Sequence, residues 1–144
     1  MSYADERAYV GAVLADWTRC PILWPASDLD GQAIAPSADP MQPTCYLAVE
    51  VGRDSEGQIA ARGLRQINGS VRAWIWVEAR LGDGVVEEIA DQLAAVFAAA
   101  PPVAGWYWTD YRLGEPVREG GFYGAEWRQS FIRFEQSAAA GGSG

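Results

Sequence analysis

The stretch LGDGVVEE, residues 81–88, contains the residue types most suggestive of a phosphate-binding loop. A glycine-rich turn between a strand and a helix can present backbone N–H groups to a phosphate. A dinucleotide-binding loop needs a third glycine at the helix start, and a P-loop needs Gly-Lys-Ser/Thr; here two valines and a glutamate follow instead. Asp83, Glu87 and Glu88 also place three carboxylates where the phosphate would sit, with Asp83 as the expected N-cap. The turn is therefore predicted to be a joint and not a nucleotide site.

Other residues with catalytic or metal-binding chemistry are few. The chain has no histidine, and its two cysteines, Cys20 and Cys45, form no CxxC pair. The usual zinc sites and all histidine-based acid–base or triad mechanisms are therefore absent. Asp28 and Asp30 lack the later acidic ligands of a calcium loop and are expected in a turn. We expect no cofactor, no metal and no enzymatic activity. The two thiols are expected to be buried apolar groups, and a Cys20–Cys45 disulfide is the open alternative.

The composition indicates an acidic globular protein. The 144 residues are 49% apolar, which suits one domain over residues 1–136, followed by a low-complexity, flexible tail over 137–144. The formal net charge of −8 argues against a protein that grips nucleic acid. Neither a signal peptide nor a membrane-spanning segment is expected, so synthesis in a cytoplasm is predicted.

The hydrophobic periodicity predicts an α+β fold. We expect helices near residues 5–18 and 85–99, and strands over 44–51, 71–81, 103–113 and 124–135. This order favours an antiparallel or mixed sheet with both helices packed on it. The core side of the second helix is predicted to be Val86, Ile89, Leu93 and Phe97. The apolar residues of the last strand do not keep one parity, which predicts a bulge near Ser130.

The segment 52–69 is predicted to be a long flexible loop between the second and third elements. It is poor in apolar side chains and has four glycines. Arg53, Arg62 and Arg65 concentrate positive charge there, in a chain that is otherwise acidic. Guanidinium groups on such an arm would suit carboxylates of a neighbouring subunit, so these arginines are candidate interface residues.

Two groups of aromatic residues have uncertain surroundings. Trp74 and Trp76 alternate with a complete apolar face of their strand, so they either pack under another element of the domain or form a subunit interface. The aromatic strand around residues 106–111 could line a pocket or stack on bases, although a buried sheet face explains it more simply. The first pair is the better candidate for an interface.

Several segments taken together resemble the tail terminator proteins of long-tailed phages and related tail-like particles. They are LWP before a proline-rich connection, the strand YLAVEV, and the run RQINGSVRAWIWVEARLGDGVVEEIADQLAAVF before a closing pair of strands. In those families a glycine opens a strand, a G-x-G-type turn follows, and an Ile-Ala-Asp-x-Leu-x-x-x-Phe helix comes next. Here the features fall on Gly69, Gly82, Gly84, Ile89, Ala90, Asp91, Leu93 and Phe97. The likeness covers most of the chain and rests on spacing and apolar pattern.

The resemblance implies a structural virion protein. Such a protein forms a six-membered ring at the head-proximal end of the tail, caps the tail tube and meets the head-completion or connector protein. An acidic lumen would let DNA pass without specific binding. No membrane partner is implied.

Two other classes of function remain open. One is a small-ligand-binding domain or an enzyme of another kind that uses the aromatic strand as a pocket wall. The other is a small protein-binding adaptor, such as an immunity-type protein, whose negative charge answers a basic partner. The mass in solution separates a ring-forming subunit from a strict monomer.

Overall fold

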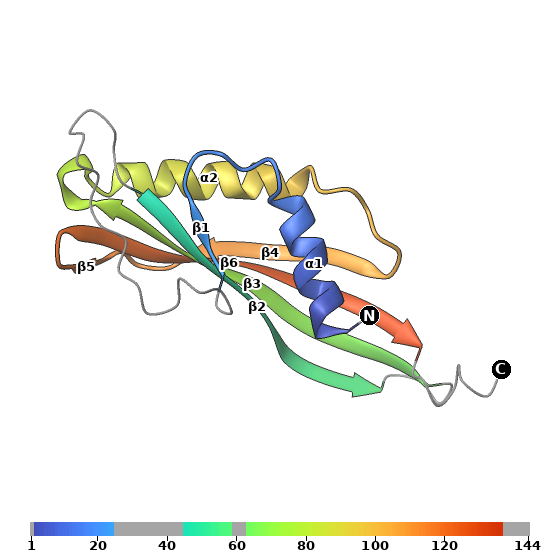
Figure 1. Ribbon diagram of the computed structural model, residues 1–144. Coiled ribbons are helices and arrows are strands. Elements are labelled where there is room, and N and C mark those ends of the chain that lie inside the picture. The colour runs from blue at the N-terminus through green and yellow to red at the C-terminus, as the bar shows by residue number, and fades with distance from the viewer. Residues whose placement is uncertain (1, 25–44, 59–62, 137–144) are drawn as a thin grey trace.

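One twisted six-stranded sheet carries the fold in this computed structural model, which describes residues 2–24, 45–58 and 63–136 (Figure 1). The strands lie in the order β1-β2-β3-β6-β4, and β5 pairs with β6 beside that path. All pairings are antiparallel except the short parallel pair of β1 and β2. The strands are β1 Ile22–Leu23, β2 Cys45–Gln58, β3 Leu64–Glu78, β4 Trp106–Leu113, β5 Val117–Glu119 and β6 Phe122–Gln136.

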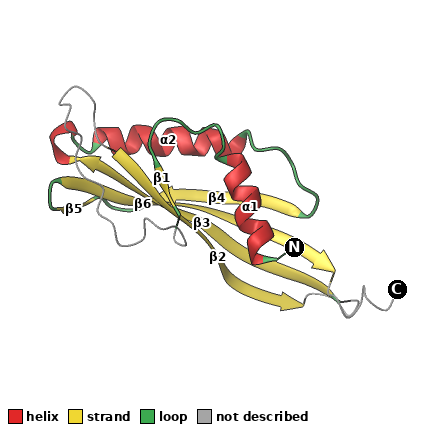
Figure 2. Ribbon diagram, in the orientation of Figure 1, coloured by secondary structure: helices red, strands yellow, loops and turns green. Residues whose placement is uncertain are grey.

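Both α-helices pack on the same face of the sheet, as Figures 1 and 2 show. They are α1, Tyr3–Val13, and α2, Gly84–Ala98. Side chains of α1, α2 and one face of β2, β3 and β6 form a single core. The described residues are therefore one α+β domain with a mixed sheet, as predicted. The structure does not describe the tail over 137–144.

The alternation of β3 explains which face the helices cover. Ala73, Ile75 and Val77 are buried in the core, while the residues between them are only partly buried. Val86, Ile89, Leu93 and Phe97 of α2 lie against this face, each at most 2% exposed. The predicted core stripe of α2 is confirmed.

The helix starts differ from the prediction in detail. The α1 helix begins at Tyr3 because Ser2 and Asp5 form a reciprocal capping box. Asp83 is the N-cap residue of α2, as predicted, but its side chain makes no capping hydrogen bond. Gly82 has a φ of +82°, a conformation that favours glycine, and turns the chain from the short 3-10 helix Ala79–Leu81 toward α2.

The flexible loop predicted over residues 52–69 is wrong. The β2 strand continues to Gln58 and β3 begins at Leu64, so most of this segment is a β-hairpin. The two strands pair from Cys45↔Val77 to Gln58↔Arg65, with one register shift between Arg53 and Ser55. Backbone pairing and charged side chains stabilise the hairpin. Its low content of apolar residues therefore did not indicate a loop.

The bulge predicted near Ser130 in the last strand is wrong. The β6 strand pairs with β3 without interruption, and Ser70 is opposite Ser130. The register shift is in β4, between Trp108 and Tyr111. Buried Gln129 donates from its side-chain Nε2 to the carbonyl oxygen of Thr109 in the bulge at 3.1 Å. A buried glutamine thus satisfies a backbone group that the ladder leaves unpaired.

Neither α1 nor α2, the α-helices of the described residues, has the length and apolar character needed to cross a membrane.

Candidate functional site

The face of the sheet opposite the helices carries both tryptophans of β3. Trp74 and Trp76 alternate with core residues, so they project from the face that neither helix covers. Their rings stack with centroids 5.8 Å apart and planes 18° apart. Tyr46 of β2 stacks on Trp76 with centroids 6.5 Å apart. We call this side of β2, β3 and β6 the open face, and these three rings form a half-buried aromatic platform on it.

The platform depends on a glycine in the adjacent strand. Gly124 of β6 is opposite Trp76 in the register. A Cβ atom at Gly124 would lie 2.3 Å from Cζ3 of Trp76, which is closer than side chains can pack. The Trp76 ring therefore lies flat on the β6 backbone. Phe122 extends the group by an edge contact with Tyr46, at a centroid distance of 6.0 Å.

Beside the platform, a row of charged residues crosses the sheet. Glu50, Arg72, Arg128 and Arg112 are register neighbours on β2, β3, β6 and β4. Arg72 pairs with Glu50 at 2.8 Å, and Arg128 lies 3.6 Å from Glu126. We call Arg72, Arg128 and Arg112 the arginine row. The row cannot be recognised from the sequence, because its three residues come together only through the strand register.

The Nε atoms of Arg72 and Arg128 are buried and have no hydrogen-bond partner among the described residues. About a third of each side chain is exposed, at 35% for Arg72 and 31% for Arg128. Each guanidinium therefore lies low on the sheet with donors that its own chain does not saturate. Because these Nε atoms are buried, a partner can reach only the exposed part of each arginine side chain.

The predicted interface arginines Arg53 and Arg65 occupy a different place. They belong to a closed ring of six alternating charges on the helix side of the sheet, whose members are Glu6, Arg53, Glu56, Arg65, Glu135 and Arg133 in that order. Within this charge ring, Glu6 lies between Arg53 and Arg133. It accepts hydrogen bonds from Nε of Arg53 and Nε of Arg133, both at 2.9 Å.

The charge ring is partly buried, which shapes its electrostatics. Glu6 is 1% exposed and Arg133 is 3% exposed. Burial alone would raise the pKa of Glu135, but the hydrogen bond from Arg133 and its positive charge outweigh that effect and lower the pKa. The pKa of Glu56 is also lowered, first by its hydrogen bond from Arg53. Both glutamates are therefore held in their charged form.

These contacts bear on the interface prediction for the arginines. Arg53 and Arg65 bind glutamates of their own chain, and the Arg53 guanidinium also lies over the Tyr3 ring at 3.9 Å. Arg62 lies outside the described residues. The structure thus brings Trp74 and Trp76 together and places Arg53 and Arg65 elsewhere.

The aromatic strand β4 forms a hollow of about 440 Å³ with the end of α2. Trp106 and Trp108 face the helices here, and Tyr9 packs against both rings. Its lining includes no carboxylate, lysine, arginine or cysteine. The amide of Gln129 already binds backbone carbonyl groups. The hollow is lined mainly by aromatic, alanine and proline side chains, and its hydroxyl groups come from Tyr9, Tyr107, Tyr111 and Thr109.

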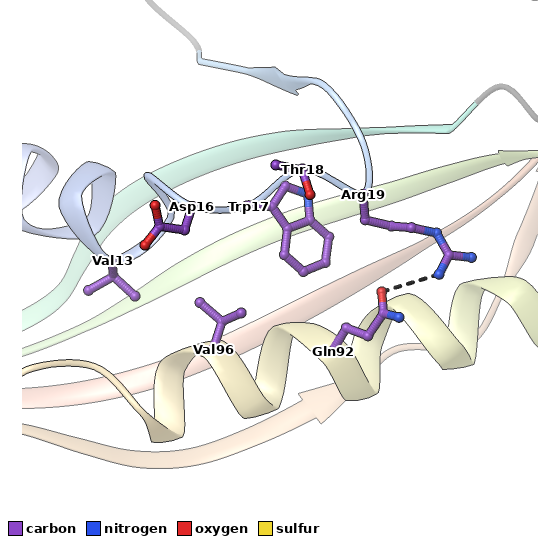
Figure 3. A pocket seen from close by; sticks show the side chains of 7 residues that line it. All are labelled: Val13, Asp16, Trp17, Thr18, Arg19, Gln92 and Val96. Atoms are coloured by element: carbon purple, nitrogen blue, oxygen red, sulfur yellow. Dashed lines mark hydrogen bonds between the residues drawn. The ribbon is translucent and has the colours of Figure 1, made fainter.

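A second hollow, of about 370 Å³, lies between α2 and the chain that follows α1 (Figure 3). Trp17 forms one wall and Val96 the other. Arg19 is held by Glu88 at 2.7 Å and by Gln92 at 3.4 Å. The Arg19 guanidinium thus binds two side chains of α2 and joins the chain that follows α1 to that helix.

The two cysteines lie next to each other under the same segment. Cys20 and Cys45 are free and buried, with their Sγ atoms 2.8 Å apart. The hydrogen bond from Cys20 lowers the pKa of Cys45 to about 7. Hydrogen bonding to Cys45, followed by burial, raises the pKa of Cys20. Either sulfur can be the donor in this contact, and Cys45 Sγ also donates to the carbonyl oxygen of Arg19 at 3.6 Å.

Comparisons with known proteins define the fold and no family. No family model matches the chain, and no curated protein sequence is similar to it. A solved structure whose name describes no function is similar in fold, with a TM-score of 0.60 at 19% identity. The match covers 95% of this chain and 99% of the other. The similarity thus supports the α+β architecture alone.

Proposed function

We propose that this chain is a structural subunit that assembles with copies of itself, a tail terminator of a phage tail or tail-like particle. The observation that carries this proposal is the aromatic platform on the open face, where Trp74 and Trp76 lie beside Gly124 with no helix over them. Large aromatic side chains on an uncovered sheet face are typical of interface centres.

The proposed assembly is a hexameric ring at the head-proximal end of the tail. It would cap the tail tube protein on one side and meet the head-completion or connector protein on the other. The resemblance of the sequence to tail terminators supplies the stoichiometry and the partners. The net charge of −8 suits a lumen through which DNA passes without specific binding.

Mass in solution tests the proposal. Native mass spectrometry and light scattering over a range of concentrations, with and without purified tail tubes, should detect a species of six times the 15.6 kDa chain mass. Electron microscopy should show that species as a ring or as a cap at one tube end. A chain that stays monomeric alone and with tubes would contradict the proposal.

The same samples distinguish the rival functions. A monomer that binds a small apolar ligand in the hollow beside Trp106 and Trp108 would favour the ligand-binding domain. A monomer that forms a one-to-one complex with a basic protein would favour the adaptor.

A further inference from the structure

We infer that Cys20 and Cys45 are a thiol–disulfide modification site, and that their disulfide fixes β1 on the edge of β2 once the particle is built. The inference rests on the proposed function in one respect: a tail protein is made in a reducing cytoplasm and leaves it in the released particle. It is carried by the contact of the two sulfur atoms, by the register of β1 on β2, and by the shortness of that pairing.

The two sulfur atoms are positioned to bond to each other. The Sγ atoms of Cys20 and Cys45 lie 2.8 Å apart, and both side chains are buried. Strand β1 pairs in parallel with β2, with Ile22 opposite Leu47. The same register, continued two residues toward the N-terminus, brings Cys20 beside Cys45. Neighbouring strands are about 4.8 Å apart, and a disulfide spans Cα separations of about 4.4–6.8 Å.

The backbone of β1 makes only a short contact with the sheet. The strand is two residues long and lies beside β2 (Figure 1). One more backbone hydrogen bond joins the same segments, from the N–H of Leu47 to the carbonyl oxygen of Pro21 at 2.9 Å. The side chain of Arg19, which reaches α2, is 34% exposed, so its ion pair there stabilises little. So short a pairing separates easily by local opening.

A disulfide would make this contact permanent. It would join Cys20, two residues before β1, to Cys45, the first residue of β2, and the two are 25 positions apart in the chain. Closing that loop removes open conformations, so β1 separates from β2 less often. Strand β1 covers the outer edge of β2 at Leu47 and Ala48, and a covered edge does not pair with another chain. The disulfide thus protects a sheet edge in the released particle.

The modification is a two-electron oxidation by a small disulfide such as glutathione disulfide. The two protein thiols lose their hydrogens, one S–S bond forms between Cys20 and Cys45, and glutathione disulfide is reduced to two molecules of glutathione. Local opening admits the oxidant, because both thiols are buried. The hydrogen bond with Cys20 lowers the pKa of Cys45 to about 7, so a thiolate is available near neutral pH. A reducing cytoplasm keeps the pair as thiols during assembly.

Hydrogen exchange tests the inference on the full chain. The dithiol form, kept in a reductant, is compared with the chain treated with glutathione disulfide, and intact mass checks that two hydrogens have been lost. Exchange of the Leu47 amide, which donates to Pro21, should slow by at least about tenfold in the oxidised chain. The Gly114 amide, which donates to Glu126 at the β4 side of the sheet, should slow less. This comparison needs no variant to fold.

The matched control is Cys20→Ser with Cys45→Ser. The same treatment should leave its Leu47 exchange unchanged, because serine forms no disulfide. A wild-type chain that keeps free thiols or forms only mixed disulfides with glutathione would overturn the inference. A Cys20–Cys45 disulfide that leaves Leu47 exchange as fast as in the dithiol would overturn it too.

Oxidation of assembled chains separates this inference from the proposed function. Rings or capped tubes formed in a reductant should stay intact when the disulfide forms, and their subunits should then unfold at a higher temperature. Rings that come apart on oxidation would overturn the inference and leave the proposed assembly intact. A chain that forms the disulfide and slows exchange at Leu47, but never associates, would contradict the proposed assembly and leave the modification site standing.

Discussion

Glu6 and Arg133 are 127 positions apart in the chain, and Nε of Arg133 donates to Oε2 of Glu6 over 2.9 Å. Both residues are buried, and Arg53 binds the other oxygen of the same carboxylate. One glutamate of α1 thus joins the helix to β2 and β6. Removal of Glu6 leaves Arg53 and Arg133 without the carboxylate that both of them bind.

Replacement of Glu6 should therefore be costly. Glu6→Ala is expected to lower the free energy of unfolding by about 3–5 kcal/mol, the usual result of breaking a buried ion pair on one side. Urea unfolding followed by circular dichroism measures the loss. Glu115→Ala, at an exposed position, is the control. Equal effects of the two changes would show that the charge ring contributes nothing to stability.

The charge ring should also make stability depend on pH in the acid range. The pKa values of Glu56 and Glu135 are lowered in the folded chain, from an ordinary value of 4.5. A lowered folded pKa means that the stabilisation is complete above the unfolded value and is lost as pH falls through the folded one. The free energy of unfolding should decline below about pH 5, and Glu135→Gln should make that decline shallower. A variant with the wild-type acid slope would contradict this origin.

Gly124→Ala should disturb the aromatic platform. The added methyl group would lie 2.3 Å from the Trp76 ring, so the ring must move away from β6. We expect a loss of about 1–3 kcal/mol, as for other overpacked sites, and a change in tryptophan fluorescence. Gly121→Ala is the matched control, because nothing lies within 4 Å of its new methyl group. Unchanged fluorescence in Gly124→Ala would mean that Trp76 does not lie on β6.

Phe97→Ala tests the contact between α2 and the sheet. The ring is 2% exposed and lies 5.0 Å from Trp108 and 5.3 Å from Trp127 between centroids. Its removal should cost about 3–5 kcal/mol in thermal or urea unfolding. Tyr107→Ala, where the ring is 58% exposed, should cost far less. A loss under about 1 kcal/mol for Phe97→Ala would contradict this packing.

Oxidation should join Cys20 and Cys45. When local opening admits glutathione disulfide to the buried pair, the Cys45 thiolate attacks one glutathione sulfur and releases the first glutathione, and Cys20 then attacks the Cys45 sulfur and displaces the second. The chain loses two hydrogens as one S–S bond forms and two glutathione molecules leave. The rate should rise with pH around 7, where Cys45 ionises. The closed loop should stabilise the fold by about 3 kcal/mol.

Intact-mass measurement and thermal unfolding follow that oxidation, and Cys45→Ser is the control. Mixed disulfides with glutathione that never resolve would show that the two sulfur atoms do not reach each other in solution.

The parts of the fold that sequence predicted well are those with one clear period. The apolar residues of α2 repeat at helical spacing, and those of β3 alternate strictly, because one side of each element meets the core. The position of α2 followed from its pattern. The strand predicted over 71–81 was correct only as far as Glu78, because β3 begins earlier, at Leu64, and Ala79–Leu81 form a 3-10 helix. The two tryptophans were correctly placed opposite the core residues for the same reason.

Other features depend on contacts that no local pattern encodes. The hairpin of β2 and β3 beyond Gly52 looked like a loop because its strands carry charge where strands usually carry apolar residues. The alternation of β6 is hard to recognise in the sequence because two of its buried, core-facing positions hold polar residues. Gln129 lies between the buried Trp127 and Phe131, and Arg133 follows Phe131. The sequence signal for the charge ring was a charged residue, Arg133, at a position of the strand that faces the core. Its partner, Glu6, could not be located from spacing.

The place of β6 between β3 and β4 sets an order of events during synthesis. The ribosome makes β3 well before β6 and β4 shortly before it, and both strands use β6 as their neighbour. Until β6 emerges, the facing edges of β3 and β4 have no partner strand, and α2 lacks the part of its packing surface that β6 provides. At ordinary translation rates of about 5–20 residues per second, that interval lasts on the order of seconds. The chain therefore completes its sheet only when β6, the last of its described strands, has been made, and its exposed strand edges are most open to aggregation during this interval.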